Sequence, residues 1–274
     1  MRRQGGRGRN VHRLDGAIRD VHRLDELSAG NSFLHRVHPL WKLLLTLWFL
    51  ALTASFPRYA LSGLLGMALY IILGFSIADL SLWEAFSRVR YVLAALFLVG
   101  IANPILDRAP MLILGGVVFS GGMVSLLSLF TKGILAVLAS YLLIATTSME
   151  DLCWALRLLR IPRLLVTVLM LTYRYILLLM QEARRMSLAC GLRCPGERGV
   201  PVSLWGPLAG QMLLRAVDRG ERVYGSMTLR GFHGEFPPPA RKPARGGVLW
   251  FAFWVGGLMV LRAVPVFELL GRLL

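Results

Sequence analysis

Residues 121–147 form a continuous apolar run, GGMVSLLSLFTKGILAVLASYLLIATT, in which Lys132 is the one charged residue. About 20 predominantly apolar residues in a helix are enough to cross the hydrocarbon layer of a bilayer. Hydrophobic residues make up 56% of the chain, which is above the usual globular range. Comparable apolar runs occur at roughly 39–56, 59–79, 89–105 and 248–268. We therefore predict an all-α membrane protein with about five transmembrane helices and a cytoplasmic helical domain.

Two other apolar stretches differ from a simple membrane span. Residues 111–122, MLILGGVVFSGG, are short and rich in glycine and β-branched side chains, which favours a small hairpin over the outer mouth. Residues 164–181 are long enough to span, but Arg174 lies in their middle, and an arginine at the bilayer centre is costly. We expect this helix to lie at or under the cytoplasmic surface, with a true span as the alternative.

Basic residues are unevenly distributed along the chain, which carries 31 Lys+Arg against 15 Asp+Glu. Residues 1–38 contain eight arginines, and residues 149–247 contain fifteen Arg and Lys. Because cytoplasmic loops of membrane proteins are enriched in basic residues, this asymmetry predicts a cytoplasmic N-terminus and an external C-terminus. The long uncharged segments argue against a nucleic-acid-binding protein. The predicted parts are a basic N-terminal arm (1–38), four spans (39–147), a cytoplasmic helical domain with its linker (148–247), and a last span with its tail (248–274).

The pentapeptide VHRLD occurs twice in the N-terminal arm, at 11–15 and 21–25. Two copies are too few for a repeat architecture. We expect the arm to be disordered or to lie on a surface, and the role of the repeated pentapeptide stays open.

Lys132 lies near the middle of the fourth apolar run, and an ionisable group within a membrane is a functional hypothesis. Ser128 and Gly133 are small enough to let another helix approach. Lys132 either contacts a partner membrane subunit, or the span begins later and the lysine reaches an interface. Both interpretations stay open.

The block from 148 to 247 reads as three helices. Ser148 can cap the first, with Glu150 and Asp151 in its first turn, and Pro162 ends it. The second is predicted over about 163–193. Near its end, residues spaced by four, three and four positions lie on one face of the helix; they are Glu182, Met186, Ala189 and Arg193.

The third helix is predicted over about 207–230 and has two faces. Its apolar stripe consists of Met212, Ala216, Gly220, Val223 and Met227, and its basic stripe of Arg215, Arg219, Arg222 and Arg230. Gly231 can end the helix sharply in the left-handed conformation. The Arg230 guanidinium could then form bidentate hydrogen bonds with a carboxylate, which favours docking to an acidic partner over a surface that faces solvent or lipid headgroups.

Motifs that would supply an energy source or a reaction are absent from the sequence. There is no G-x-x-x-x-G-K-[ST], no H-E-x-x-H and no G-x-S-x-G. The predicted spans are almost free of Asp and Glu, which proton-driven carriers place in the membrane. A membrane protein with a basic domain and no energy source of its own is expected to be a subunit.

Five stretches together resemble one family, the transmembrane T component of energy-coupling factor (ECF) transporters in its cobalt-type branch, CbiQ. They occur in order over roughly 30–235, and are SFLHRVHPLWKLL, NPILDR, TTSMEDLCWALRLLRIPRLL, LTYRYILLLMQEARRMSLACGLR and GERVYGSMTLRGFHG. The family is marked by two Ala-Arg-Gly-like signatures that end its coupling helices. The second corresponds to Leu229-Arg230-Gly231, and the first to Leu192-Arg193-Cys194, which keeps only the arginine. Arg198-Gly199 is the other placement of the first signature.

This resemblance implies a non-catalytic subunit in the bacterial cell membrane. Its coupling helices would dock into two copies of an ABC ATPase, with Arg193 and Arg230 pairing with acidic residues there. Glu182, Met186, Ala189, Arg222 and Met227 would support the docking faces. ATP hydrolysis by the ATPases would reorient a membrane S component, similar to CbiM with or without a CbiN-like subunit, that carries Co²⁺ or Ni²⁺. The chain itself would bind no cofactor and no metal, and the choice between cobalt and nickel would rest with the S component.

Two other classes of function make different demands on the sequence. A stand-alone secondary carrier should show intramembrane carboxylates or inverted repeats, and neither is visible. An integral-membrane enzyme should show clustered Asp, His or Glu at the interface, but the short loop 80–88 offers only Glu84.

Overall fold

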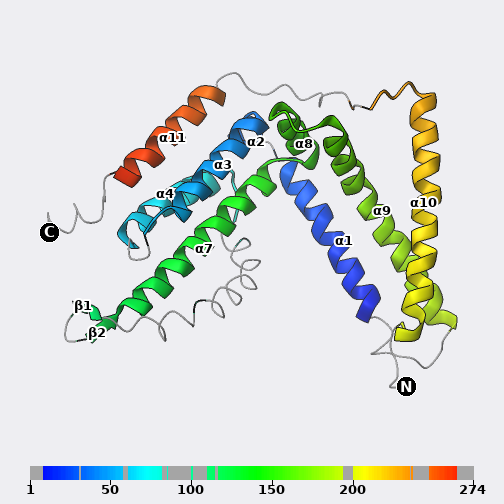
Figure 1. The fold of residues 1–274 in the computed structure, drawn as a ribbon, viewed down its shortest axis with the longest axis horizontal. Helices are drawn as coiled ribbons and strands as arrows, with labels where there is room; N and C mark the ends of the chain where they lie inside the picture. Colours follow the sequence, from blue (N-terminus) through cyan, green and yellow to red (C-terminus); the bar gives the residue numbers. More distant parts are fainter. Residues whose placement is uncertain are drawn as a thin grey trace. The chain divides into compact units, whose positions relative to one another are not determined.

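The computed structural model describes residues 9–30, 32–57, 61–81, 85, 100, 110–114, 117–193, 200–234, 236 and 247–263. Apart from one β-hairpin, the regular structure of these residues is helical (Figure 1). Contacts divide the chain into two compact units. The membrane unit comprises Ser28–Ser148 and Arg241–Leu274, and the amphipathic unit comprises Met1–Leu27 and Met149–Ala240.

Four helices of the membrane unit correspond to predicted spans. The unit's elements are α2 (Phe33–Arg36), α3 (Pro39–Ala54), α4 (Leu61–Ile77), β1 (Pro110–Leu114), β2 (Val117–Ser120), α7 (Gly121–Thr146) and α11 (Gly247–Ala263). The predicted third span, 89–105, lies outside the described residues except for Gly100, and so does the end of the predicted fifth span. The all-α membrane fold class is confirmed for the part of the chain that the structure describes.

A hairpin forms where the glycine-rich stretch predicted one. Strands β1 and β2 pair antiparallel, with Ile113 opposite Val118 and Leu114 opposite Val117. The hairpin occupies Pro110–Ser120 rather than 111–122, because α7 already begins at Gly121.

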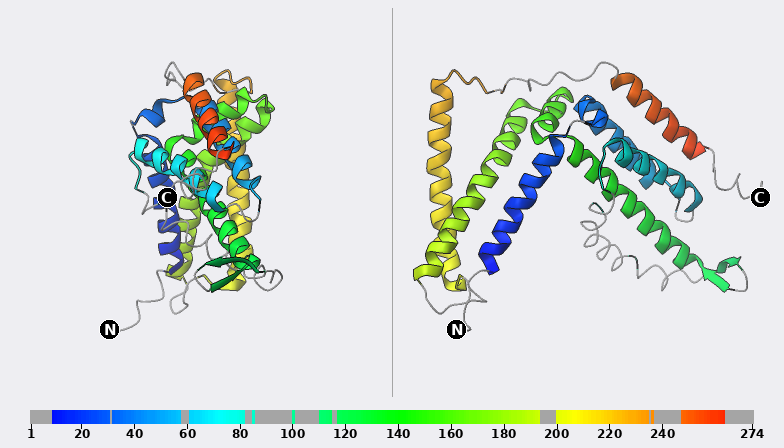
Figure 2. Two further views of the ribbon diagram at one scale, coloured as in Figure 1. Left: turned by 90° about the vertical axis from the view of Figure 1, so that its left-hand side faces the viewer. Right: turned by 180° about the vertical axis from the view of Figure 1, so that it is seen from behind.

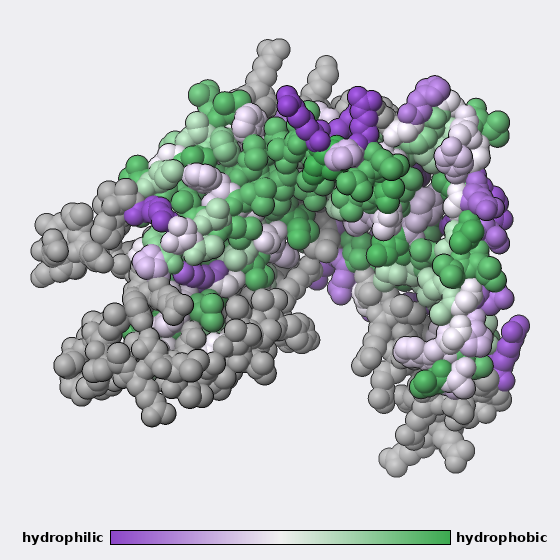
Figure 3. Space-filling view, viewed as in Figure 1, coloured by the Kyte–Doolittle hydropathy of each residue, from purple (hydrophilic) through white to green (hydrophobic). Residues whose placement is uncertain are grey.

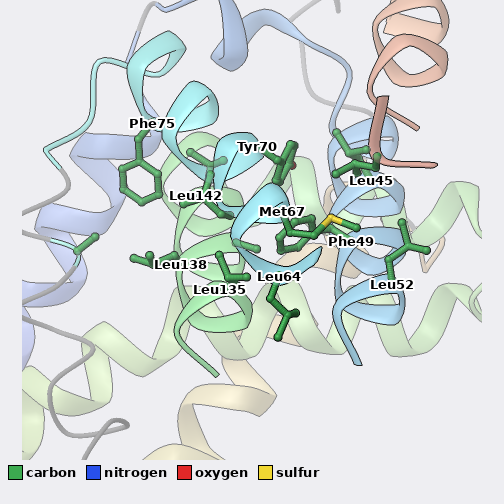
Figure 4. Close-up of a cluster of buried hydrophobic side chains, with 14 of the residues drawn as sticks. Leu45, Phe49, Leu52, Leu64, Met67, Tyr70, Phe75, Leu135, Leu138 and Leu142 are labelled. Carbon is green, nitrogen blue, oxygen red and sulfur yellow. The ribbon is translucent and has the colours of Figure 1, made fainter. Parts of the chain in front are cut away.

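The core of the membrane unit lies between α3, α4 and α7 (Figure 4). Lipid tails are as apolar as leucine, so such helices associate through close van der Waals packing rather than through the hydrophobic effect. The packing is tight where α4 meets α7, since a Cβ added at Gly74 would lie 2.6 Å from Cδ2 of Leu142. The labelled core side chains are Leu45, Phe49 and Leu52 of α3, Leu64, Met67, Tyr70 and Phe75 of α4, and Leu135, Leu138 and Leu142 of α7.

Two lysines join the antiparallel helices α3 and α7 reciprocally. Lys42 Nζ donates to the carbonyl oxygen of Thr146 at 2.6 Å, and Lys132 Nζ donates to the carbonyl oxygen of Phe56 at 2.6 Å. Each ammonium group lies at the carboxyl end of the other helix, where unpaired carbonyls favour a cation. Lys132 is therefore level with the end of α3, and the interpretation that it reaches an interface stays a prediction. Contact with a partner subunit stays a prediction.

The amphipathic unit is made of α1 (Arg9–Ser28), α8 (Met149–Leu158), α9 (Arg163–Arg193), the 3₁₀ turn η1 (Val202–Leu204) and α10 (Trp205–Leu229). The proline and glycine signals placed the ends of α8, α9 and α10 to within about two residues. Of the two alternatives for the N-terminal arm, disorder is wrong for residues 9–28, which form a helix, and a position on a surface stays a prediction. Of the described helices, α7 and α9 are long and apolar enough to cross a membrane by length and composition.

Candidate docking site

Helices α9 and α10 run antiparallel, as Figures 1 and 2 show. Glu182 of α9 forms an ion pair with Arg215 of α10. Near the start of α9, Thr167 Oγ1 donates a hydrogen bond of 3.1 Å to the carbonyl oxygen of Gly234, which lies beyond the end of α10. The end of α9 and the end of α10 therefore point in opposite directions. Arg193 lies 26 residues after Thr167, so the two predicted docking arginines are separated by about 40 Å along the helix axis.

The end of α10 forms a Schellman motif around Gly231. Gly231 has φ +76°, and its N–H donates to the carbonyl of Thr228 at 3.0 Å. The N–H of Phe232 donates to the carbonyl of Met227 at 3.0 Å. These are the two hydrogen bonds by which a left-handed residue after a helix satisfies its last carbonyls. The prediction that Gly231 ends the helix in this conformation is confirmed.

The chain after this cap is tied back to the rest of the amphipathic unit. Besides the bond from Thr167 to Gly234, Arg157 Nη1 of α8 donates to the carbonyl oxygen of Phe236 at 3.2 Å. The Phe232 and Phe236 rings lie 5.1 Å apart. The short segment that carries Arg230 is therefore held on both sides, and Arg230 itself is exposed.

Each of the two helix ends carries an exposed leucine followed by an exposed arginine, which we call a Leu-Arg pair. Leu192 is 79% exposed and Leu229 is 90% exposed, and the arginine that follows each is also exposed. Large apolar side chains this exposed at a helix end, next to a guanidinium, are suited to a partner that offers both an apolar contact and a carboxylate. Sequence analysis included both leucines in the two signatures but assigned a docking role only to the arginines. Cys194 and Arg198 lie outside the described residues.

The residues predicted to support docking fall into different environments. Glu182 pairs with Arg215 and lies 3.9 Å from Arg185 Nη1, so its carboxylate helps to join α9 to α10. In the last turns of α9, Met186 is half-buried and Ala189 is exposed. Arg222 of α10 is also exposed. The basic stripe predicted as one face is thus divided, because Arg215 is used within the unit. Figure 3 shows hydrophilic side chains along the outer edge of α10.

The apolar stripe of α10 faces α9 across a groove of about 700 Å³. Ala216, Gly220, Val223 and Met227 line one side, and apolar side chains of α9 line the other. Four of the five residues of the stripe therefore face α9, while Met212 is not part of the groove lining.

No group of three or more His, Cys, Asp or Glu side chains among the described residues is arranged to hold a metal ion. The two separated helix ends each offer an exposed leucine and an exposed guanidinium group.

Comparison with known proteins gives one family over most of the chain. Residues 30–240 match the family model described as CbiQ, cobalt transport protein. The chain is 27% identical over 231 residues to the cobalt transport protein CbiQ of Salmonella typhimurium, covering 78% of this chain and 98% of that protein. It is 31% identical over 103 residues to CbiQ of Rhodobacter capsulatus, covering 37% of this chain and 42% of that protein. An uncharacterised protein of Methanocaldococcus jannaschii is 32% identical over 120 residues, covering 43% of this chain and 44% of its own length.

The match includes both helix ends and four of the described apolar helices, α3, α4, α7 and α9. Helices α3, α4 and α7 form the core of the membrane unit, while α9 and α10 carry the exposed Leu-Arg pairs. Membership points to a component of a transporter rather than to an enzyme. The chain belongs to the CbiQ family of cobalt transport proteins.

Proposed function

We propose that this chain is the transmembrane coupling (T) subunit of an ECF-type ABC importer for cobalt or nickel ions. Two copies of an ATPase bind Arg193 at the end of α9 and Arg230 at the end of α10. Their ATP-driven closure moves these helices, and the membrane unit reorients a metal-binding S component. The chain crosses the bacterial cell membrane several times with its N-terminus in the cytoplasm, and it binds neither ATP nor the metal.

The observation that carries this proposal is the position of the two exposed Leu-Arg pairs at opposite ends of one helix pair. A separation of about 40 Å is too large for both arginines to enter one groove. It suits one chain that engages two separate partner subunits. A bidentate arginine–carboxylate pair at each end gives each contact both strength and a defined orientation.

The test is the number of ATPase subunits that co-purify with variants of the chain. Removing one hydrogen-bonded charge costs about 1.5–3 kcal/mol, so Arg193→Ala or Arg230→Ala should weaken its own contact roughly 10- to 150-fold. Because the two sites are far apart, the free-energy losses should add. Each single variant should retain one ATPase copy by light scattering, and the double variant should retain none.

Arg174→Ala is the matched control, because Arg174 is an exposed arginine in the interior of α9, 19 residues before Arg193. It should leave the stoichiometry unchanged. A double Arg193/Arg230 variant that still binds two ATPases, or metal uptake by the purified chain alone in vesicles, would refute the proposal. The second result would favour a stand-alone carrier.

A further inference from the structure

The repeated pentapeptide VHRLD is not explained by the family match. Both copies, at 11–15 and 21–25, precede residue 30, where the match to the family model begins. In the structure both lie in α1, a helix of the amphipathic unit.

The last residue of each copy contacts α9. Asp15 Oδ1 lies 2.6 Å from Arg184 Nε in an ion pair, and Asp25 Oδ1 accepts a hydrogen bond of 2.5 Å from the Tyr173 hydroxyl. Asp15 is the more sheltered member of its pair, at 24% exposed against 45% for Arg184. The same position of the repeat thus supplies a carboxylate twice, to two different donors of one helix.

The spacings on the two helices match. Asp15 and Asp25 are ten residues apart, which is about 15 Å along a helix, and Tyr173 and Arg184 are eleven residues apart, about 16.5 Å. Eleven residues are three turns, so the two α9 donors lie on one face. The first aspartate of α1 contacts the later residue of α9, and the second aspartate contacts the earlier one. Helix α1 therefore runs antiparallel to α9, as Figures 1 and 2 show.

We propose that α1 is an intramolecular clamp that holds α9 at two points, with one copy of VHRLD supplying the carboxylate for each. Close to the Asp15–Arg184 pair, the two helices line an open hollow of about 400 Å³. It is lined by Ile18 and Arg19 of α1 and by Gln181 and Arg185 of α9. A hollow at this place means that the polar contacts, rather than a continuous apolar seam, hold this part of the helix pair together.

The clamp also bears on the two environments left open for residues 164–181, over the part that begins at Tyr173. Helix α9 is apolar enough to span a membrane, but a helix with the sequence HRLDGAIRDVHRLDE cannot accompany it into hydrocarbon, where unsolvated charges are costly. With α1 bound, the part of α9 from Tyr173 to Arg184 lies outside the hydrocarbon layer. Arg193 follows Arg184 by nine residues, so the clamp also steadies the end of α9, a consequence that rests on the proposed docking function.

The test is hydrogen exchange of the purified full-length chain. In the variant Asp15→Asn/Asp25→Asn, amides of α1 and of residues 173–184 should exchange roughly 3- to 50-fold faster than in the unchanged chain, from the combined loss of one ion pair and one hydrogen bond. Asp20→Asn is the control, because Asp20 is an exposed aspartate of α1 between the two copies. The clamp is refuted if the double variant exchanges like the unchanged chain, or if Asp20→Asn has the same effect.

A charge exchange gives a second arm. Asp15→Arg and Arg184→Asp should each speed exchange of α1, and the two together should restore slow exchange; failure of the pair to restore it overturns the assigned contact. A lipid-soluble carbene reagent should label α7 but not residues 173–184, and labelling of both would overturn the exclusion of α9 from hydrocarbon. These measurements need no ATPase. If ATPase binding does not depend on Arg193 and Arg230, the proposed function is refuted, but the clamp is not affected.

Discussion

Replacing Gly231 by alanine should weaken the end of α10 through its backbone alone. A Cβ added at Gly231 meets no atom within 4 Å, so no steric contact contributes. The residue nevertheless has φ +76°, where a side chain costs about 1–2 kcal/mol. This strain should weaken the two cap hydrogen bonds, which the N–H groups of residues 231 and 232 donate to the carbonyls of Thr228 and Met227. Amides 231 and 232 should therefore exchange hydrogen roughly 5- to 30-fold faster.

The same substitution at Gly210 should act in the opposite direction. Gly210 is an exposed residue inside α10, and its added Cβ also meets nothing within 4 Å. Alanine is favoured over glycine in a helix interior by about 0.5–1 kcal/mol, so exchange in the first half of α10 should slow roughly 2- to 5-fold. Equal effects of the two substitutions, or unchanged exchange in Gly231→Ala, would show that the cap does not hold Arg230.

Three further predictions test other parts of the chain. Arg160 has φ +64° at the end of α8, so Arg160→Gly should stabilise the α8–α9 turn by about 1 kcal/mol, seen as slower exchange of its amides. Lys42 is buried whereas Lys132 is half-buried, so Lys42→Met should lower the melting temperature in detergent more than Lys132→Met, because it leaves a buried carbonyl without its donor. Burial, with a smaller contribution from the Glu150 carboxylate, raises the pKa of the Cys153 thiol. Because the folded chain holds this proton more tightly than the unfolded chain, the free energy of unfolding should fall as the pH rises above the ordinary thiol pKa. Alkylation of Cys153 at pH 8 should also be slower in the folded chain than in the unfolded chain.

Local signals predicted the amphipathic unit well because its helix ends are set by nearby residues. Pro162 separates α8 from α9, and Gly231 ends α10 through bonds that reach back only a few residues. The apolar stripe of α10 was readable for the same reason, since its residues recur at helical spacing. Features of this kind require no knowledge of the tertiary structure.

The features that sequence reasoning missed depend on partners far away in the chain. Helix α1 is polar, and the contacts of Asp15 and Asp25 are with side chains that lie 169 and 148 residues later in the chain. The ammonium of Lys132 reaches Phe56, 76 residues earlier, so hydropathy could not show that the lysine lies level with the end of α3. Arg215 was grouped with a docking face because its ion pair with Glu182 spans 33 residues.

The two helix ends that carry the Leu-Arg pairs are held by different means, although their sequences look alike. At Arg230 the backbone is fixed by a glycine cap, and the following residues are bonded to α8 and to the start of α9. Arg193 is the last residue of a 31-residue helix, and side-chain contacts hold the last part of that helix: Cys190 is buried, and Glu182 and Arg184 form ion pairs with α10 and α1. The direction of the chain at Arg230 is therefore set by a backbone cap, whereas the position of Arg193 depends on the side chains that pack beside α9.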